Sequence, residues 1–113
     1  MTYIDKIPQS TVVDLKQLID LANDEVTSRT LVQRPDLTLT LFAVGTGEEI
    51  GGHEAAGDAM VNVLSGVAAI TIADQTYTVA AGQTIVIPAG QRHSLYAQEG
   101  FQMLLTVVKP AKS

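Results

Sequence analysis

Residues 47–66 read GEEIGGHEAAGDAMVNVLSG, and residues 82–93 read GQTIVIPAGQRH. Together these two segments hold both histidines of the chain, His53 and His93, and they place glycines where apolar runs end. Glycine tolerates a positive φ and so marks sharp reversals of the backbone. Pro88 cannot donate to a strand ladder and ends the run before it. The spacing predicts short strands joined by tight turns.

The pattern of short strands extends over most of the chain. Within residues 26–109 apolar residues alternate with polar ones or occur in β-branched runs, which predicts about eight strands. Two of the expected turns are Ser65–Gly66 and Glu99–Gly100, each between two separate strands. A series of this kind is typical of an all-β sandwich or barrel.

Residues 1–25 are predicted to form an N-terminal arm with one short helix. The apolar residues of this arm recur at helical spacing, namely Leu15, Leu18, Ile19 and Ala22. Thr11 and Asp14 have the spacing of a capping box, which would start the helix near residue 11. With 113 residues the chain is expected to form a single domain, because this length suffices for one core and not for two.

Composition excludes several classes of function. The formal net charge is −5, and the seven basic residues form no stripe, which argues against a nucleic-acid partner. The absence of cysteine excludes disulfides, thiolate metal sites and cysteine nucleophiles. No apolar run approaches the roughly 20 residues that span a bilayer, and the N-terminus lacks the features of a signal peptide. A cytoplasmic protein without a membrane partner is therefore expected.

The first segment resembles the first motif of the cupins, a family of small jelly-roll barrels. That motif runs Gly, five residues, His-x-His, three or four residues, Glu, six residues, Gly. Three positions of this chain match it, Gly47, His53 and Gly66. Ala55 stands where the family has its second histidine, and Ala59 stands where it has the glutamate.

The second segment resembles the second cupin motif more completely. That motif runs Gly, five residues, Pro-x-Gly, two residues, His, three residues, Asn. Gly82, Pro88, Gly90 and His93 match it, and Ala97 replaces the asparagine. The resemblance implies an all-β fold, a cupin-type jelly-roll β-barrel over residues 26–109 with a short N-terminal helix before it.

The resemblance also implies a pocket inside the barrel. Cupins usually hold a divalent metal there with three histidines and one glutamate, and His53 and His93 are the two of these ligands that this chain retains. Alternation along the strands predicts that both histidines point inward and face each other across the barrel. The same alternation predicts an otherwise aliphatic wall, formed by Ala55, Ala59, Val61, Leu95 and Ala97. Glu54 is expected to point away from His53 unless the chain bulges at Gly51–Gly52.

Two functions follow from this pocket, and the sequence leaves both open. The first is a metal-dependent enzyme that holds manganese, iron, zinc or nickel and acts on a small organic molecule. The second is a cupin that binds a small molecule without catalysis and without a functional metal. The substrate and the reaction type are not determined by any motif of the chain. A homodimer is expected as well, because Met60, Asn62 and Leu64 form an outward-facing row, hereafter the outer stripe, that a monomer rarely leaves bare.

Overall fold

The computed structural model describes residues 3–110, apart from the side chain of His53. Within this range there are seven strands and one short 3-10 turn, so the all-β prediction is confirmed. The 3-10 turn is η1 (Leu15–Leu18), and the strands are β1 (Val26–Gln33), β2 (Leu37–Val44), β3 (Glu49–His53), β4 (Asp58–Ile72), β5 (Gln75–Ala80), β6 (Thr84–Ile87) and β7 (His93–Val108).

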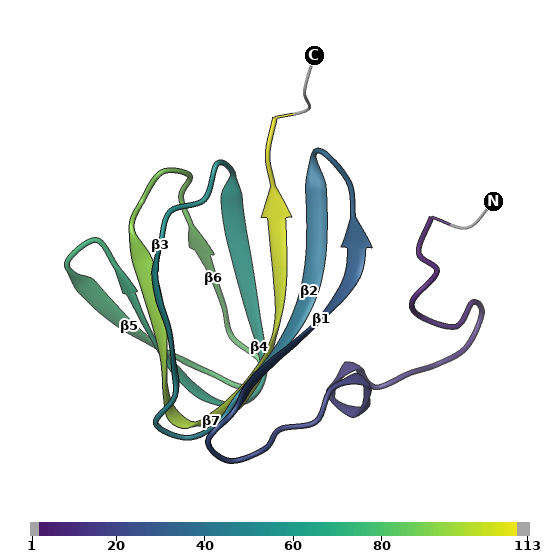
Figure 1. Ribbon diagram of the computed structural model, residues 1–113, viewed down its shortest axis with the longest axis horizontal. Coiled ribbons are helices and arrows are strands. Elements are labelled where there is room, and N and C mark those ends of the chain that lie inside the picture. The colour runs from purple at the N-terminus through teal and green to yellow at the C-terminus, as the bar shows by residue number, and fades with distance from the viewer. Residues whose placement is uncertain (1–2, 111–113) are drawn as a thin grey trace.

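The strands form one strongly curled antiparallel sheet with two halves. The first half contains β1, β2, β6, the beginning of β4 and the end of β7. The second contains β3, β5, the end of β4 and the beginning of β7. Figure 1 shows the result as a cup with β5 at one side and β1 at the other. The sheet does not close into a hydrogen-bonded barrel, because β1 and β5 remain the two ends of the pairing path.

The strands β4 and β7 run through both halves of the cup, which corrects two of the turns expected from the sequence. Ser65–Gly66 and Glu99–Gly100 are not turns, since each lies inside one continuous strand. The register between β4 and β7 shifts repeatedly between Val63 and Ala68, so the two strands bend together at a bulge. Gly66 has a φ of +76°, and a Cβ there would collide with the carbonyl oxygen of Gly100. The two strands expected on either side of Ser65–Gly66 are therefore one strand, β4. Those expected on either side of Glu99–Gly100 are likewise one strand, β7.

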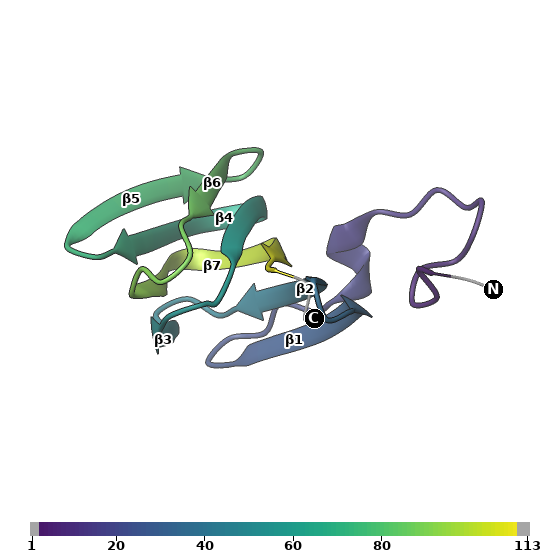
Figure 2. The same cartoon turned by 90° about the horizontal axis from the view of Figure 1, so that it is seen from above.

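The N-terminal arm holds less helix than its apolar spacing predicts. The only helical element between residues 3 and 25 is η1, and its N-cap is Asp14, whose side chain accepts from the backbone N–H of Lys16. The residues before Asp14 do not begin a helix as the capping-box pattern suggested. Figures 1 and 2 show the arm on the outer side of β1 and β2, with its first residues standing away from the sheet.

Gln102 joins the arm to the outer face of the sheet. Its side chain is buried, its Nε2 donates to the carbonyl oxygens of Lys16 and Ile19 at 2.9 and 2.8 Å, and its Oε1 accepts from the Ser65 hydroxyl. Apolar residues around this contact form an outer cluster, which includes Ile19, Leu31, Leu41, Leu64 and Leu104. The arm therefore covers one member of the outer stripe, Leu64, with residues of the same chain.

The main core lies inside the cup and is aliphatic, as the composition requires. The inward residues of β4 and β7 are almost fully buried there, among them Val61, Val63, Ala68, Ala97, Phe101 and Met103. Each fully buried side chain of valine size or larger contributes about 1.5–3 kcal/mol to folding. This core fills the narrow end of the cup and leaves space nearer its rim.

Candidate ligand cavity

A cavity of about 370 Å³ lies between the two halves of the cup. Nine of the eleven described residues that line it are apolar, and the other two are Glu54 and His93. The wall of the first half comes from β2, β4, β6 and the end of β7, and that of the second half from β3, the loop after it and the start of β7. The apolar lining residues are Phe42, Ile50, Ala55, Ala59, Ile87, Leu95, Met103, Leu105 and Val107.

Four residues that the sequence places in the pocket line this cavity, His93, Ala55, Ala59 and Leu95. Val61 and Ala97 also point inward, but they belong to the packed core and not to the cavity wall. Alternation assigns a residue to the inner or outer face of a strand. It does not tell how deep in the cup that residue lies, and Val61 and Ala97 lie in its filled part.

His53 and His93 are direct neighbours in the sheet. Their Cα positions are partners in the pairing of β3 with β7, so the two residues stand on adjacent strands and do not face each other across the barrel. The side chain of His53 lies outside the described part of the structure. The strand β3 itself falls in a segment that the sequence pattern presents as a turn, because Gly47 before it and Gly51 and Gly52 within it interrupt the alternation.

Glu54 lines the cavity beside Ala55, directly after the end of β3. The register between β3 and β7 shifts between Ile50 and His53, and Gly52 in this interval has a φ of +45°. Simple alternation predicted that Glu54 points away from the pocket in the absence of a bulge, and the bulge at Gly51–Gly52 is present. Two consecutive residues can line the same cavity because β3 ends at His53 and residues 54 and 55 no longer follow strand geometry.

Arg92 lies on the other side of the sheet from the cavity. The guanidinium extends over Gly52, where a Cβ would come within 2.8 Å of Nη2. It lines an outer hollow of about 300 Å³ together with Glu49, Thr71 and Ser94, and His93 lines both this hollow and the cavity. The absence of a side chain on Gly52 leaves room for this arginine.

The ring of His93 is oriented by its own backbone. Its Nδ1 lies 3.1 Å from the carbonyl oxygen of Gln91. A carbonyl oxygen only accepts, so Nδ1 carries the proton in this contact and the lone pair of the neutral ring is on Nε2. His93 makes further interactions besides this one.

The loops at the open end of the cup are tied to each other. The backbone N–H of Ala89 donates to Oδ1 of Asp58 at 2.9 Å, and the N–H of Gly90 donates to the carbonyl oxygen of Ala55 at the same distance. Asp58 thus has a structural partner in the loop between β6 and β7. These two bonds hold the cavity residue Ala55 at a defined place on the rim.

The side chains that the structure describes do not form a metal site. Among them no three histidine, aspartate or glutamate residues lie close enough to share an ion. The cavity wall offers one imidazole, from His93, and one carboxylate, from Glu54. Protein metal centres usually have at least three protein ligands, and Ala55 and Ala59 have no donor atom to supply the others.

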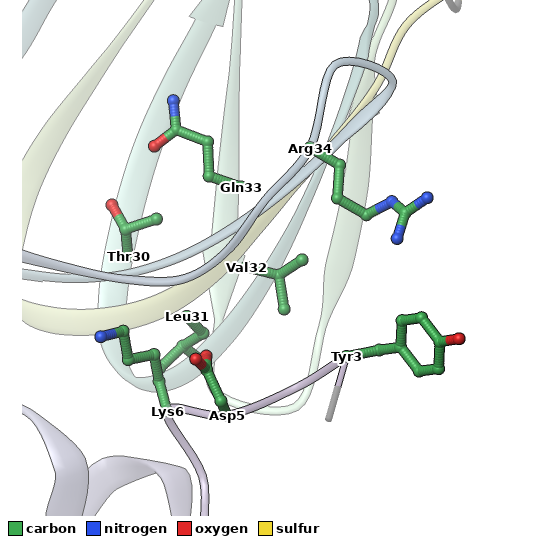
Figure 3. Close-up of a pocket in the computed structure, with 8 residues that line it drawn as sticks. All are labelled: Tyr3, Asp5, Lys6, Thr30, Leu31, Val32, Gln33 and Arg34. Carbon is green, nitrogen blue, oxygen red and sulfur yellow. The ribbon is translucent and has the colours of Figure 1, made fainter. Parts of the chain in front are cut away.

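Another hollow, of about 360 Å³, separates the N-terminal arm from β1. It is lined by Tyr3, Asp5, Lys6 and residues 30–34, and Figure 3 shows that these side chains point in different directions rather than toward a common centre. Binding sites depend on a few polar groups that converge on the ligand. This hollow contains none of the residues that the sequence singles out.

Comparison with known proteins gives the same fold. The model of the family described as "Cupin domain" matches residues 40–109. The chain resembles a conserved protein of unknown function from Streptococcus pyogenes, with 56% identity over 99% of this chain and 98% of the other, and a TM-score of 0.95. It also resembles a cupin superfamily protein from Desulfitobacterium hafniense, with 27% identity over 96% and 100% of the two chains, and a TM-score of 0.91.

A third similar structure is a cupin 2 conserved barrel domain protein from Leptotrichia buccalis. It is 32% identical over 86% of this chain and 47% of its own length, with a TM-score of 0.84. No curated protein matches the chain. In the described range no helix has the length and hydropathy to cross a membrane.

Proposed function

The chain belongs to the cupin domain family, and we propose that it binds one small, mostly apolar organic molecule in the cavity between the two halves of its sheet. The observation that carries this proposal is the cavity of about 370 Å³ with nine apolar lining residues and two polar ones. Pockets of about 300–1,000 Å³ with apolar walls and a few placed polar groups are the usual form of small-molecule sites.

The chemistry of the wall predicts how affinity depends on the size of the ligand. Each methylene group moved from water into an apolar site contributes about 0.8 kcal/mol, which is about a fourfold gain in affinity. A cavity of 370 Å³ has the volume of roughly a dozen water molecules. Affinity for linear alcohols should therefore rise about fourfold per carbon over the first members of the series and stop rising once the cavity is full.

The experiment is a titration of the ¹⁵N-labelled protein with n-butanol to n-octanol, followed by amide chemical shifts. The amides of Ala55, Ala59 and Leu95 should move, and the dissociation constants should follow the predicted series. Ala59→Met fills the cavity and should abolish binding. Ala69→Met is the matched control, since it adds the same side chain to the same strand on its outer face. Equal binding by both variants, or no dependence on chain length, would refute the proposal.

A second candidate is a metal-dependent enzyme acting on a small organic molecule. The observation that favours it is that His53 pairs with His93 in the register of β3 and β7. Glu54 follows His53 directly in the chain. The described side chains do not complete a metal site. Elemental analysis of protein purified without a histidine tag tests this candidate, with His93→Ala as its control. One equivalent of manganese, iron, zinc or nickel that is lost in the variant would support it.

We further propose that the molecule is a cytoplasmic homodimer. The support comes from the outer face of the first half, where Met60 of the outer stripe is 37% exposed and its neighbour Val86 is 52% exposed. The arm has exposed apolar residues as well, Tyr3 and Val12. A second copy of the chain would cover the part of this outer face that the N-terminal arm of the same chain does not cover.

A further inference from the structure

We propose that the cavity selects a positively charged ligand, a small primary amine with an apolar body, and that Glu54 is the residue that determines this specificity. The inference rests on the proposed function and adds the chemical class of the ligand. Among ligands of equal shape, the amine should bind most tightly, the neutral alcohol less tightly and the carboxylate least.

The charges that face the cavity favour a cation. Among the eleven described residues that line the cavity, Glu54 is the one carboxylate, and none is a lysine or an arginine. Walls of low polarity around a charge of one sign concentrate its field inside a cleft. The net charge of −5 adds a field of the same sign. An ammonium group is therefore favoured in this cavity, and a carboxylate would approach another carboxylate there.

Arg92, a candidate for a compensating cation, is not among the described residues that line the cavity. Arg92 precedes the cavity residue His93 in the chain, yet its guanidinium lies over Gly52 and lines the outer hollow. Glu49 lines this outer hollow as well and does not line the cavity. Of these two acidic residues, Glu54 therefore lines the cavity, and Glu49, five positions earlier, lines the outer hollow.

The expected preference is modest because Glu54 stays exposed at the rim. Ion pairs at exposed positions contribute up to about 1 kcal/mol, which corresponds to about fivefold in affinity. Hexylamine should therefore bind up to about fivefold more tightly than hexanol. Hexanoate should bind more weakly than hexanol by a similar factor. Because exposed charges are screened by salt, both differences should narrow in 0.5 M sodium chloride.

The experiment measures the affinities of hexylamine, hexanol and hexanoate at pH 8, where alkylamines are protonated and imidazoles are normally neutral. Amide chemical shifts of the cavity residues report binding to the wild type, to Glu54→Gln and to Glu49→Gln. The two variants change the net charge equally, so they separate a local effect from the field of the whole chain. Glu54→Gln should bring the amine and the alcohol to equal affinity, while Glu49→Gln should keep the wild-type ratio.

Several results would overturn the inference. Hexanoate that binds as tightly as hexylamine would refute it, and so would equal effects of the two variants or a preference that salt does not reduce. If hexanol binds in these cases, the proposed function is not affected. A failure of all three ligands, including neutral hexanol, would instead refute the proposed function itself and the inference with it.

Discussion

The bend shared by β4 and β7 can be tested by two alanine substitutions that differ in one respect. Gly66 lies in this bend with a φ of +76°, and Gly82 lies in the turn before β6 with a φ of +87°. A Cβ on Gly82 meets no atom within 4 Å. A Cβ on Gly66 meets the Gly100 carbonyl and comes within 2.7 Å of the Cα of Phe101. Both substitutions strain the backbone, but only Gly66→Ala also pushes two strands apart.

The expected loss of unfolding free energy follows from these two contributions. A left-handed backbone conformation costs an L-residue roughly 1–2 kcal/mol, and this is the whole cost expected for Gly82→Ala. Overpacking of a tightly packed region adds about 1–3 kcal/mol. For Gly66→Ala the overlap is with backbone atoms, which cannot rotate away, so a total of about 3–5 kcal/mol is expected. Native domains are stable by only about 5–15 kcal/mol, so this variant should lose a large share of its stability.

Urea denaturation of the wild type and both variants, followed by far-UV circular dichroism, measures these losses. Gly66→Ala should unfold at a clearly lower urea concentration than Gly82→Ala, or fail to fold where Gly82→Ala folds. Equal stability of the two variants, within about 0.5 kcal/mol, would refute the close approach of the two strands at the bend. The continuous β4 and β7 would then be wrong, and a turn at Ser65–Gly66 would be the better interpretation.

Three further predictions concern the arm, the assembly and the metal. Gln102→Ala should lower stability by about 2–3 kcal/mol, because it leaves the buried carbonyl oxygen of Ile19 and the part-buried one of Lys16 without their donor. Hydrogen exchange should also accelerate in the arm, and unchanged exchange there would contradict the contact. Light scattering should give twice the chain mass of 12.0 kDa at micromolar concentration, and a monomer would contradict the role given to the outer stripe. The double variant Ala55→His, Ala59→Glu should bind manganese, zinc or nickel much more tightly than the parent in calorimetric titrations, since both positions line the cavity. No gain in affinity would show that the two alanines do not occupy the ligand positions of the family.

Local sequence patterns determined most of the strands and the family. Strands β1, β2, β5 and β6 lie where period-two alternation and the flanking turn residues place them, because each of these signals acts within a few residues. The resemblance of Gly82, Pro88, Gly90 and His93 to the second cupin motif implied the fold. The positions of Ala55 and Ala59 at the cavity could be anticipated, because the family motif relates them to His53 by offset alone.

Tertiary contacts decided the features that local patterns leave ambiguous. A glycine with positive φ fits a hairpin turn and a bulge equally well, and only the approach of Gly100 to Gly66 makes this position a bulge. The same ambiguity applies at Gly51–Gly52, where the pairing of β3 with β7 makes this position a bulge. Gln102 faces outward because the carbonyl oxygens of the arm, more than eighty residues earlier in the chain, accept its hydrogen bonds. Such choices depend on groups distant in sequence, and a period of two or a motif offset contains no information about them.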